Sequence, residues 1–429
     1  MSKQPTMQSE ISKTYRHNFI VNLLDGGFFG MALGFASFIT VIPLFVNTMT
    51  DSAILIGLIP AIHSVGWQLP QLFTANRVSR LQRYKPMVLL VTINERLPFF
   101  GLGLVAWFLP SLGPKLGLWM TFGLLIWQGM GGGFTATAWQ SMIAKIIPEA
   151  RHGTFFGTQS AVANLFASGA GVAAGLLLEK LELPINYAVC FFIATLSMGI
   201  SYFFISLTRE DPVAPAESDS PAGSFYRNLI AILKRDRRFR WFLVVRSLSQ
   251  LSVIAFSFYT VYAVRALGMT EAVAGLMMGV YTVGQIVANP IMGWIGDNWN
   301  HPAVMVIGAM AATVSALVAW AAPHLGWFYL AFVLAGIANV AIWTIGLAMT
   351  LKFGSLSERP VYIGLANTLV APFTILAPLL GGWLADFAGF EYTFFLSAIF
   401  GVITAIVLVL TLREPRRRVQ PPLDLSLEE

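Results

Sequence analysis

Long apolar stretches alternate with short polar connections along almost the whole chain. The stretches cover residues 19–47, 52–75, 86–109, 114–147, 154–178 and 184–208, and then 240–266, 271–296, 302–322, 325–351, 360–385 and 390–412. Each is near or above the roughly 20 residues that a tilted helix needs to cross a bilayer. The pattern predicts an all-α polytopic membrane protein with twelve transmembrane helices.

A polar segment separates the twelve stretches into two sets of six. Residues 209–239 contain prolines, acidic residues and the basic run at 234–238. We interpret this segment as a linker between an N-terminal six-helix half at 19–208 and a C-terminal half at 240–412. Residues 1–18 and 413–429 then form the two terminal segments.

Basic residues indicate the orientation of the chain. If the spans alternate from an inside N-terminus, 22 lysines and arginines lie on the inner side, and only Lys115, Lys180 and Arg265 lie outside. Cytoplasmic loops of membrane proteins carry such an excess of basic residues. We therefore expect the N-terminus, the linker and the C-terminus to be cytoplasmic, in a plasma (inner) membrane whose anionic lipids attract the linker.

The two halves share a weak internal repeat. At one offset of 207 residues, four pairs match: Gly129 with Gly336, Lys145 with Lys352, Gly157 with Gly364, and Gly175 with Gly382. Duplicated halves are typical of transporters that rock around a central site. The repeat favours two pseudo-symmetric halves and alternating access.

Composition excludes several other classes of protein. The chain is 56% apolar and only 11% charged, with a mean hydropathy of +0.70, whereas soluble proteins are about 25% charged. A soluble enzyme or a nucleic-acid binder is therefore not expected, although the net charge is +6. The single Cys190 lies in an apolar run and predicts a lipid- or core-facing thiol. No nucleotide-binding loop or metal-ligand spacing is present, so we expect no cofactor and no metal.

Two loops each carry part of a motif of glycine, aspartate and basic residues. The second half has Gly293 and Asp297 at the required spacing, but the run 298–300 that follows is Asn-Trp-Asn instead of basic residues. The first half has Asn76 in place of the aspartate, and keeps the basic residues Arg77 and Arg80. This motif, together with the twelve spans and the central linker, resembles the major facilitator superfamily. The glycine–proline signature of the drug/proton antiporters in that family is missing from the fifth span at 168–175. The resemblance implies a major facilitator fold in which the first and seventh spans line a central cavity.

Four charged residues lie inside predicted spans, where charge is costly and usually functional. Asp25 and Arg246 occupy matching depths in spans one and seven, so we expect them to form an inner gate or a coupling pair. The alternative is that each charge reaches the cytoplasmic interface or caps local backbone. Glu95 and Arg96 are neighbours on span three and point about 100° apart, so they should not share one cavity. They fit either a structural network or proton coupling.

Uncharged polar and aromatic residues recur along the faces of other spans. Such faces are expected to contact protein or a water-filled cavity. The candidates for lining the cavity are Gln128, Thr135, Trp139, Gln250, Ser257, Asn339 and Trp343. The candidates for stripes between the halves are His63, Trp67, Gln71, Asn164, Tyr281, Gln285, Asn289 and Asn367. Amides and indoles with few charges together favour a neutral or amphipathic organic solute, whereas any single one of these residues more often serves helix packing than ligand contact.

We therefore expect a monomeric secondary transporter, not an enzyme, that binds a small-molecule substrate and membrane lipids. Proton coupling is one option, with Asp25 first and Glu95 second as proton carriers; facilitated diffusion and another ion are the others. A drug or lipophile efflux antiporter is the alternative within the same class. A non-transporting scaffold or receptor and a membrane-embedded lipid enzyme are the alternatives from other classes.

Overall fold

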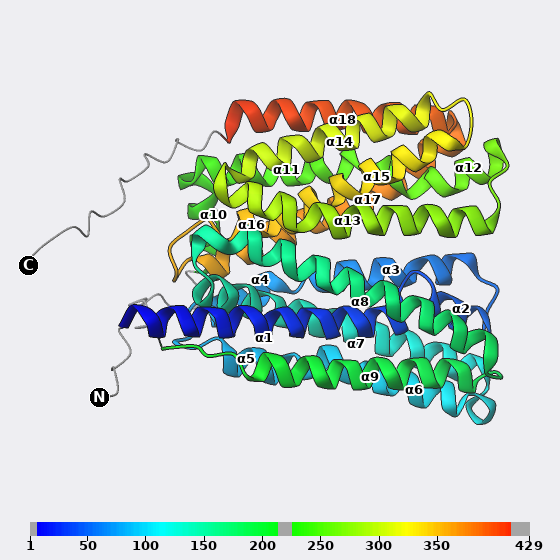
Figure 1. The fold of residues 1–429 in the computed structure, drawn as a ribbon, viewed down its shortest axis with the longest axis horizontal. Coiled ribbons are helices and arrows are strands. Elements are labelled where there is room, and N and C mark those ends of the chain that lie inside the picture. The colour runs from blue at the N-terminus through cyan, green and yellow to red at the C-terminus, as the bar shows by residue number, and fades with distance from the viewer. Residues whose placement is uncertain (1–6, 213–224, 413–429) are drawn as a thin grey trace, which may run out of the picture.

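The computed structural model describes residues 7–212 and 225–412. The two halves form two helical bundles that lie side by side, the N-terminal half in blue to green and the C-terminal half in green to red (Figure 1). Helix α1 begins and helix α18 ends at the same end of the molecule, on the left in Figure 1. We call this the terminal end and the opposite one the far end. Parts of the predicted terminal segments and linker (1–6, 213–224 and 413–429) lie outside the described residues.

The N-terminal half is built from nine α-helices and one 3-10 turn within its described residues. They are α1 (Met7–Phe35), α2 (Val41–Asn47), α3 (Ala53–Gln68), α4 (Gln71–Val78), α5 (Lys85–Val91), α6 (Ile93–Trp107), α7 (Leu109–Ile146), η1 (Glu149–Arg151), α8 (His152–Lys180) and α9 (Ile185–Ser206). Helix α1 begins at Met7, before the apolar run that starts at residue 19, so its first turns are polar. Breaks near Pro70 and at Thr92 divide the second and third spans into two helices each.

A short linker helix, α10 (Phe225–Arg235), precedes the C-terminal half, which repeats this plan. The elements of that half are α11 (Arg237–Ser252), η3 (Ile254–Phe258), α12 (Tyr259–Leu267), α13 (Glu271–Asn298), α14 (His301–Trp320), α15 (Gly326–Val340), η4 (Ala341–Ile345), α16 (Gly346–Thr350), α17 (Arg359–Phe387) and α18 (Phe390–Thr411). Helix α10 lies within the predicted linker. Its Leu229 and Ile232 are buried against the C-terminal half.

Within the described residues, nine helical segments are long and apolar enough to cross a membrane. The remaining three predicted spans correspond to α3 with α4, to α7 and to α13. Helices α3 and α4 are each too short to span a membrane alone, because the chain breaks between them. Helices α7 and α13 carry glycines and amides, such as Gln128 and Gln285, that lower their hydropathy. All twelve predicted spans are therefore present as helices.

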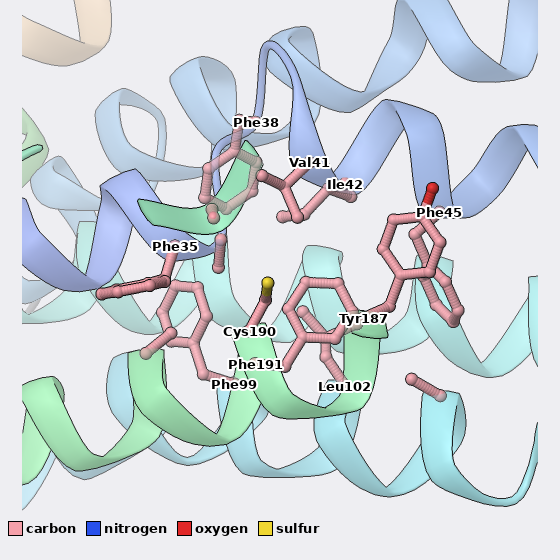
Figure 2. Close-up of a cluster of buried hydrophobic side chains, with 14 of the residues drawn as sticks. Phe35, Phe38, Val41, Ile42, Phe45, Phe99, Leu102, Tyr187, Cys190 and Phe191 are labelled. Atoms are coloured by element: carbon pink, nitrogen blue, oxygen red, sulfur yellow. The ribbon is translucent and has the colours of Figure 1, made fainter. Parts of the chain in front are cut away.

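An aromatic core holds the far end of the N-terminal half together. Figure 2 shows Phe35 at the end of α1, Phe38 in the break that follows and Phe45 on α2, all on the side that faces Phe99 of α6 and Phe191 of α9. Cys190 is fully buried among them, so the thiol faces the core. Aromatic pairs such as Phe45 with Phe191, whose ring centroids are 5.3 Å apart, stabilise this region beyond their buried area.

The two halves meet along two helix pairs, α8 with α13 and α4 with α17. At the terminal end, Gly153 and Gly293 bring the backbones of α8 and α13 into direct contact, and a Cβ on Gly153 would lie 2.6 Å from the Gly293 carbonyl oxygen. Toward the far end, a Cβ at Gly175 or at Gly275 would meet no atom within 4 Å, and α8 leans away from α13 (Figure 1). The seam between the halves, meaning these two helix pairs, is closely packed at the terminal end.

Candidate functional site

A cavity of about 380 Å³ lies where the two halves face each other near mid-depth. We call it the central cavity. Of the residues expected from the sequence to contribute, it is lined by Asp25, His63, Trp67, Glu95, Arg96, Thr135, Trp139 and Trp343. Lining residues that were not expected from the sequence include Phe29, Ser64, Gln68, Thr92, Gln159 and Leu347, and the wall also contains Gly132 and Ser160. Most of the wall belongs to the N-terminal half.

A buried cluster of three charges forms one side of the central cavity. Arg96 Nη2 lies 3.3 Å from Asp25 Oδ1, and Arg96 Nη1 lies 3.8 Å from Glu95 Oε2. The hydroxyl of Ser201 on α9 donates to Asp25 Oδ1 at 2.6 Å, and Arg96 also donates to Ser201 and Thr92. Two carboxylates and one guanidinium leave this cluster with one surplus negative charge when all three are ionised.

Two expectations about these charges are wrong for this structure. Asp25 pairs with Arg96 of its own half rather than with Arg246, which instead donates to Asn367 Oδ1 at 3.2 Å and Thr350 Oγ1 at 3.4 Å. Glu95 and Arg96 do share the central cavity. The long guanidinium side chain bends back toward its neighbour's carboxylate, which Cβ directions alone do not reveal.

Aromatic side chains form a second part of the wall of the central cavity, and one of them, Phe29, lies directly beside the charge cluster, with its ring centroid 5.5 Å from Arg96 Cζ. Trp67, Trp139 and Phe29 contribute from the N-terminal half, and Trp343 contributes from η4 of the C-terminal half. Element η4 is a π-helical turn, and such turns are frequent at functional sites. An ideal Cβ at Gly132 would lie 2.8 Å from Glu95 Oε1 and 3.4 Å from Trp67 Cδ1. The missing side chain at Gly132 thus leaves a niche between a carboxylate and an indole.

Several cavity candidates lie elsewhere. Gln128 is buried behind the wall, where its Oε1 lies 3.0 Å from His63 Nδ1. The His63 ring also stacks on Phe38 at 4.1 Å between centroids, so packing positions this histidine. Gln250 is buried in α11, and Ser257 is exposed on η3. The central cavity is not lined by Gln128, Gln250 or Ser257, nor by Arg246 or Asn339.

Hydrogen bonds between the expected stripes cross the seam. Asn367 Nδ2 donates to Gln71 Oε1 at 2.7 Å, and Asn164 Nδ2 donates to Gln285 Oε1 at 3.0 Å. Gln285 Nε2 in turn donates to Asn339 Oδ1 at 3.2 Å within the C-terminal half. Two further stripe residues lie on α13: Asn289, which accepts from Thr344 at 2.7 Å, and Tyr281, which packs on α15 near Gly336. These polar faces therefore contact protein across or beside the seam.

The loop motif of the second half also reaches across the seam. Asp297, near the end of α13, accepts hydrogen bonds from the backbone nitrogens of Gly153 at 2.9 Å and Thr154 at 2.6 Å. Both nitrogens belong to the first turn of α8, where a negative charge is stabilised by the helix dipole. The carboxylate therefore fastens α13 to α8 at the terminal end.

The first-half motif makes a different arrangement. Asn76 is half-buried on α4, and its carbonyl oxygen accepts from the Ser79 hydroxyl at 2.9 Å. Arg77 and Arg80 are exposed at the end of this helix. Nearby, the buried carboxylate of Glu210 accepts from Lys145 at 2.9 Å and from the backbone nitrogens of Tyr84 and Lys85 at the start of α5. Burial and the neighbouring Glu210 raise the pKa of the Tyr84 phenol, so it stays neutral.

Comparison with known sequences decides the family. The sequence model of the Major Facilitator Superfamily matches residues 92–264 and 242–427. The chain belongs to this superfamily. It is therefore an integral membrane protein of a transporter family, and not an enzyme.

Relatives of this major facilitator protein are distant. It is 26% identical over 151 residues to Multidrug resistance protein 1 of Bacillus subtilis (strain 168), which is 35% of this chain and 39% of that protein. It is 24% identical over 157 residues to the Vesicular acetylcholine transporter of Drosophila melanogaster, or 36% of this chain and 27% of that one. The matched segments thus span well under half of these relatives.

Solved structures support the same fold. The E. coli fucose:proton symporter FucP, in the outward conformation, matches with a TM-score of 0.75 and 14% identity over 94% of this chain and 100% of that chain. A bacterial homologue of the iron transporter ferroportin, in an outward-facing state, matches with a TM-score of 0.69 and 13% identity over 93% and 99%. At this identity the likeness establishes the twelve-helix fold alone.

Proposed function

We propose that this protein is a secondary transporter that moves a small neutral or amphipathic organic solute across the membrane by alternating access, coupled to protons. The observation that carries the proposal is the central cavity, which combines an aromatic wall with a charge cluster that has one carboxylate in surplus. Aromatic rings bind apolar bodies, and a surplus carboxylate binds a proton or a positive group. Among amphipathic solutes, this favours one with a positive group.

Glu95 is the better candidate for the proton carrier, which reverses the order expected from the sequence. The Asp25 carboxylate is held by Arg96 and by Ser201 at 2.6 Å. Glu95 has weaker support, with Arg96 at 3.8 Å and the Thr92 hydroxyl at 3.4 Å. The carboxylate with fewer partners for its charged form is the one that gains a proton more readily.

The close packing at the terminal end indicates which conformation of the alternating-access cycle the structure represents. With both termini in the cytoplasm, as the basic residues favour, the close contacts of Gly153 and Gly293 lie on the cytoplasmic side. We infer that this conformation is closed toward the cytoplasm. Alternating access then requires these contacts to separate.

The test is transport by purified protein in lipid vesicles, with a proton gradient and a panel of amphipathic organic solutes. Wild-type protein should accumulate one of them above its equilibrium level. Glu95→Gln should bring that solute only to equal concentrations on both sides while retaining exchange, because the surplus proton site is lost. Glu179→Gln, a neutralised exposed carboxylate on α8, is the matched control and should accumulate like wild type.

The outcomes separate the alternatives. Full accumulation by both Glu95→Gln and Asp25→Asn would exclude proton coupling through this cluster. Absence of saturable flux for every solute would favour the scaffold or receptor alternative. The efflux antiporter alternative, favoured by relatives named as multidrug resistance proteins, predicts that several unrelated lipophilic solutes compete for one flux.

A further inference from the structure

A buried positive charge lies behind the seam, on α11, and has no carboxylate partner among the described residues. Arg246 on α11 is only 4% exposed, and its Nη1 donates to two neutral groups, Asn367 Oδ1 and Thr350 Oγ1. Among residues 7–212 and 225–412, the ion pairs of buried arginines involve Arg96 and not Arg246. A buried ion is costly unless it is paired. This arginine therefore needs a partner that the surrounding side chains do not supply.

Two buried hydrogen-bond donors at this place in the fold lack an acceptor. Arg246 Nε is buried without a partner, and so is Nε2 of Gln250. Gln250 lies one helical turn further along the same face of α11. The neighbouring acceptors are already in use. Asn367 Oδ1 faces the guanidinium, and Gln71 Oε1 accepts from both Asn367 and Gln140. Two N–H groups beside a full positive charge thus lack an acceptor.

One unpaired acceptor does exist nearby, but it belongs to the other side of the seam. Gln140 Oε1 on α7 is buried without a partner. Gln140 is connected to Arg246 through a series of side-chain hydrogen bonds that runs by way of Gln71 and Asn367. It supplies no charge, so it does not balance the guanidinium.

We propose that Arg246 and Gln250 bind a small monovalent anion, either a halide or the carboxylate group of an organic solute. The ligand is monovalent because one positive charge is unpaired, and small because both side chains are at most 5% exposed and Arg246 Nε lies within 3.9 Å of an ideal Cβ at Gly346. The anion accepts hydrogen bonds from Arg246 Nε and Gln250 Nε2. The site does not depend on proton-coupled transport through the central cavity.

The anion also favours the closed seam. Asn367 accepts from Arg246 through its Oδ1 and donates to Gln71 of the other half through its Nδ2, so the contact between α4 and α17 helps to position the guanidinium that binds the anion. A ligand that binds one conformation more tightly shifts the population toward it.

The experiment follows the thermal unfolding of the full-length protein in detergent while sodium gluconate, whose anion is too large for the site, is replaced by sodium chloride at constant ionic strength. A second series uses sodium acetate. Wild-type protein should show a saturable rise in its unfolding midpoint with one or both small anions, as mass action requires for a ligand that binds the folded state. A rise in the unfolding midpoint with chloride alone would identify a halide site, and a rise with acetate would identify a carboxylate site.

Two variants test the residues. Arg246→Gln should raise the half-saturating anion concentration by at least about tenfold. Gln250→Glu places a carboxylate one turn from Arg246 and should abolish the response while keeping the fold, because the charge is then balanced internally. Arg265→Gln on α12 is the matched control and should respond like wild type. An absent anion-specific rise in wild-type protein, or an equal rise in wild type and Gln250→Glu, would overturn the proposal.

Discussion

Replacing Asp297 tests whether one side chain controls the closure of the seam. Asp297→Asn removes the negative charge at the start of α8, and the single amide oxygen cannot replace both carboxylate oxygens that accept from Gly153 and Thr154. A hydrogen bond to a charged group contributes about 1.5–3 kcal/mol, and an anion at a helix N-terminus about 0.3–1 kcal/mol. We expect a loss of about 2–3 kcal/mol from the closed seam. This corresponds to a shift of about 30- to 150-fold in the equilibrium between closed and open seams.

The assay measures the distance between the far ends of α8 and α13. Spin labels are attached at Val172 and Leu276, which are both exposed, and the native Cys190 is fully buried and stays unlabelled. If the halves rock, an opening seam at the terminal end brings the far ends together. Asp297→Asn should therefore show a larger population at short label distances than wild type.

The control replaces an exposed carboxylate far from the seam contact. Asp386→Asn on α17 removes the same charge without affecting the first turn of α8, and its distance distribution should match that of wild type. Identical distributions in Asp297→Asn, Asp386→Asn and wild type would refute the reasoning. The hydrogen bonds of Asp297 would then not bias the conformational equilibrium.

Two further predictions concern the niche and the orientation. Gly132→Ala places a methyl group against Glu95 and should raise the KM for the transported solute about tenfold. The control is Gly123→Ala on the same helix, which should leave KM unchanged because no atom lies within 4 Å of its Cβ. Equal KM values in the two variants would show that the solute does not use the niche. A cysteine beside Lys234 should react with an impermeant label only from the cytoplasmic side and one beside Lys115 only from outside, and the reverse labelling would contradict the topology.

The periodic features of the chain were open to prediction because they depend on local interactions and on the membrane. A helix satisfies its own backbone in lipid, so twelve apolar stretches are sufficient to predict twelve spans. The match of the family model confirms the expected superfamily. Irregular details were not predictable in this way. The π-helical turn at η4, which contains Trp343, and the break between α1 and α2 depend on contacts with other helices.

The site was only partly predictable for a similar reason. Burial cost alone marks Asp25, Glu95, Arg96 and Arg246 as exceptional in a sequence, and all four prove to be buried. Their partners depend on which helices are neighbours and how far long side chains reach. Asp25 meets Arg96 because α1, α6 and α9 pack together, and matched depth in the sequence wrongly favoured Arg246.

The sequence by itself determined the class, the twelve spans and the uneven distribution of basic residues among the connecting loops, because each follows from hydropathy and charge read along the chain. Only the tertiary structure decided which polar groups share a cavity, which charges are paired, and which end of the seam is closed. Those properties depend on contacts between helices far apart in sequence. Short-range contacts such as Asp297 with Gly153 exist only when both halves are in place.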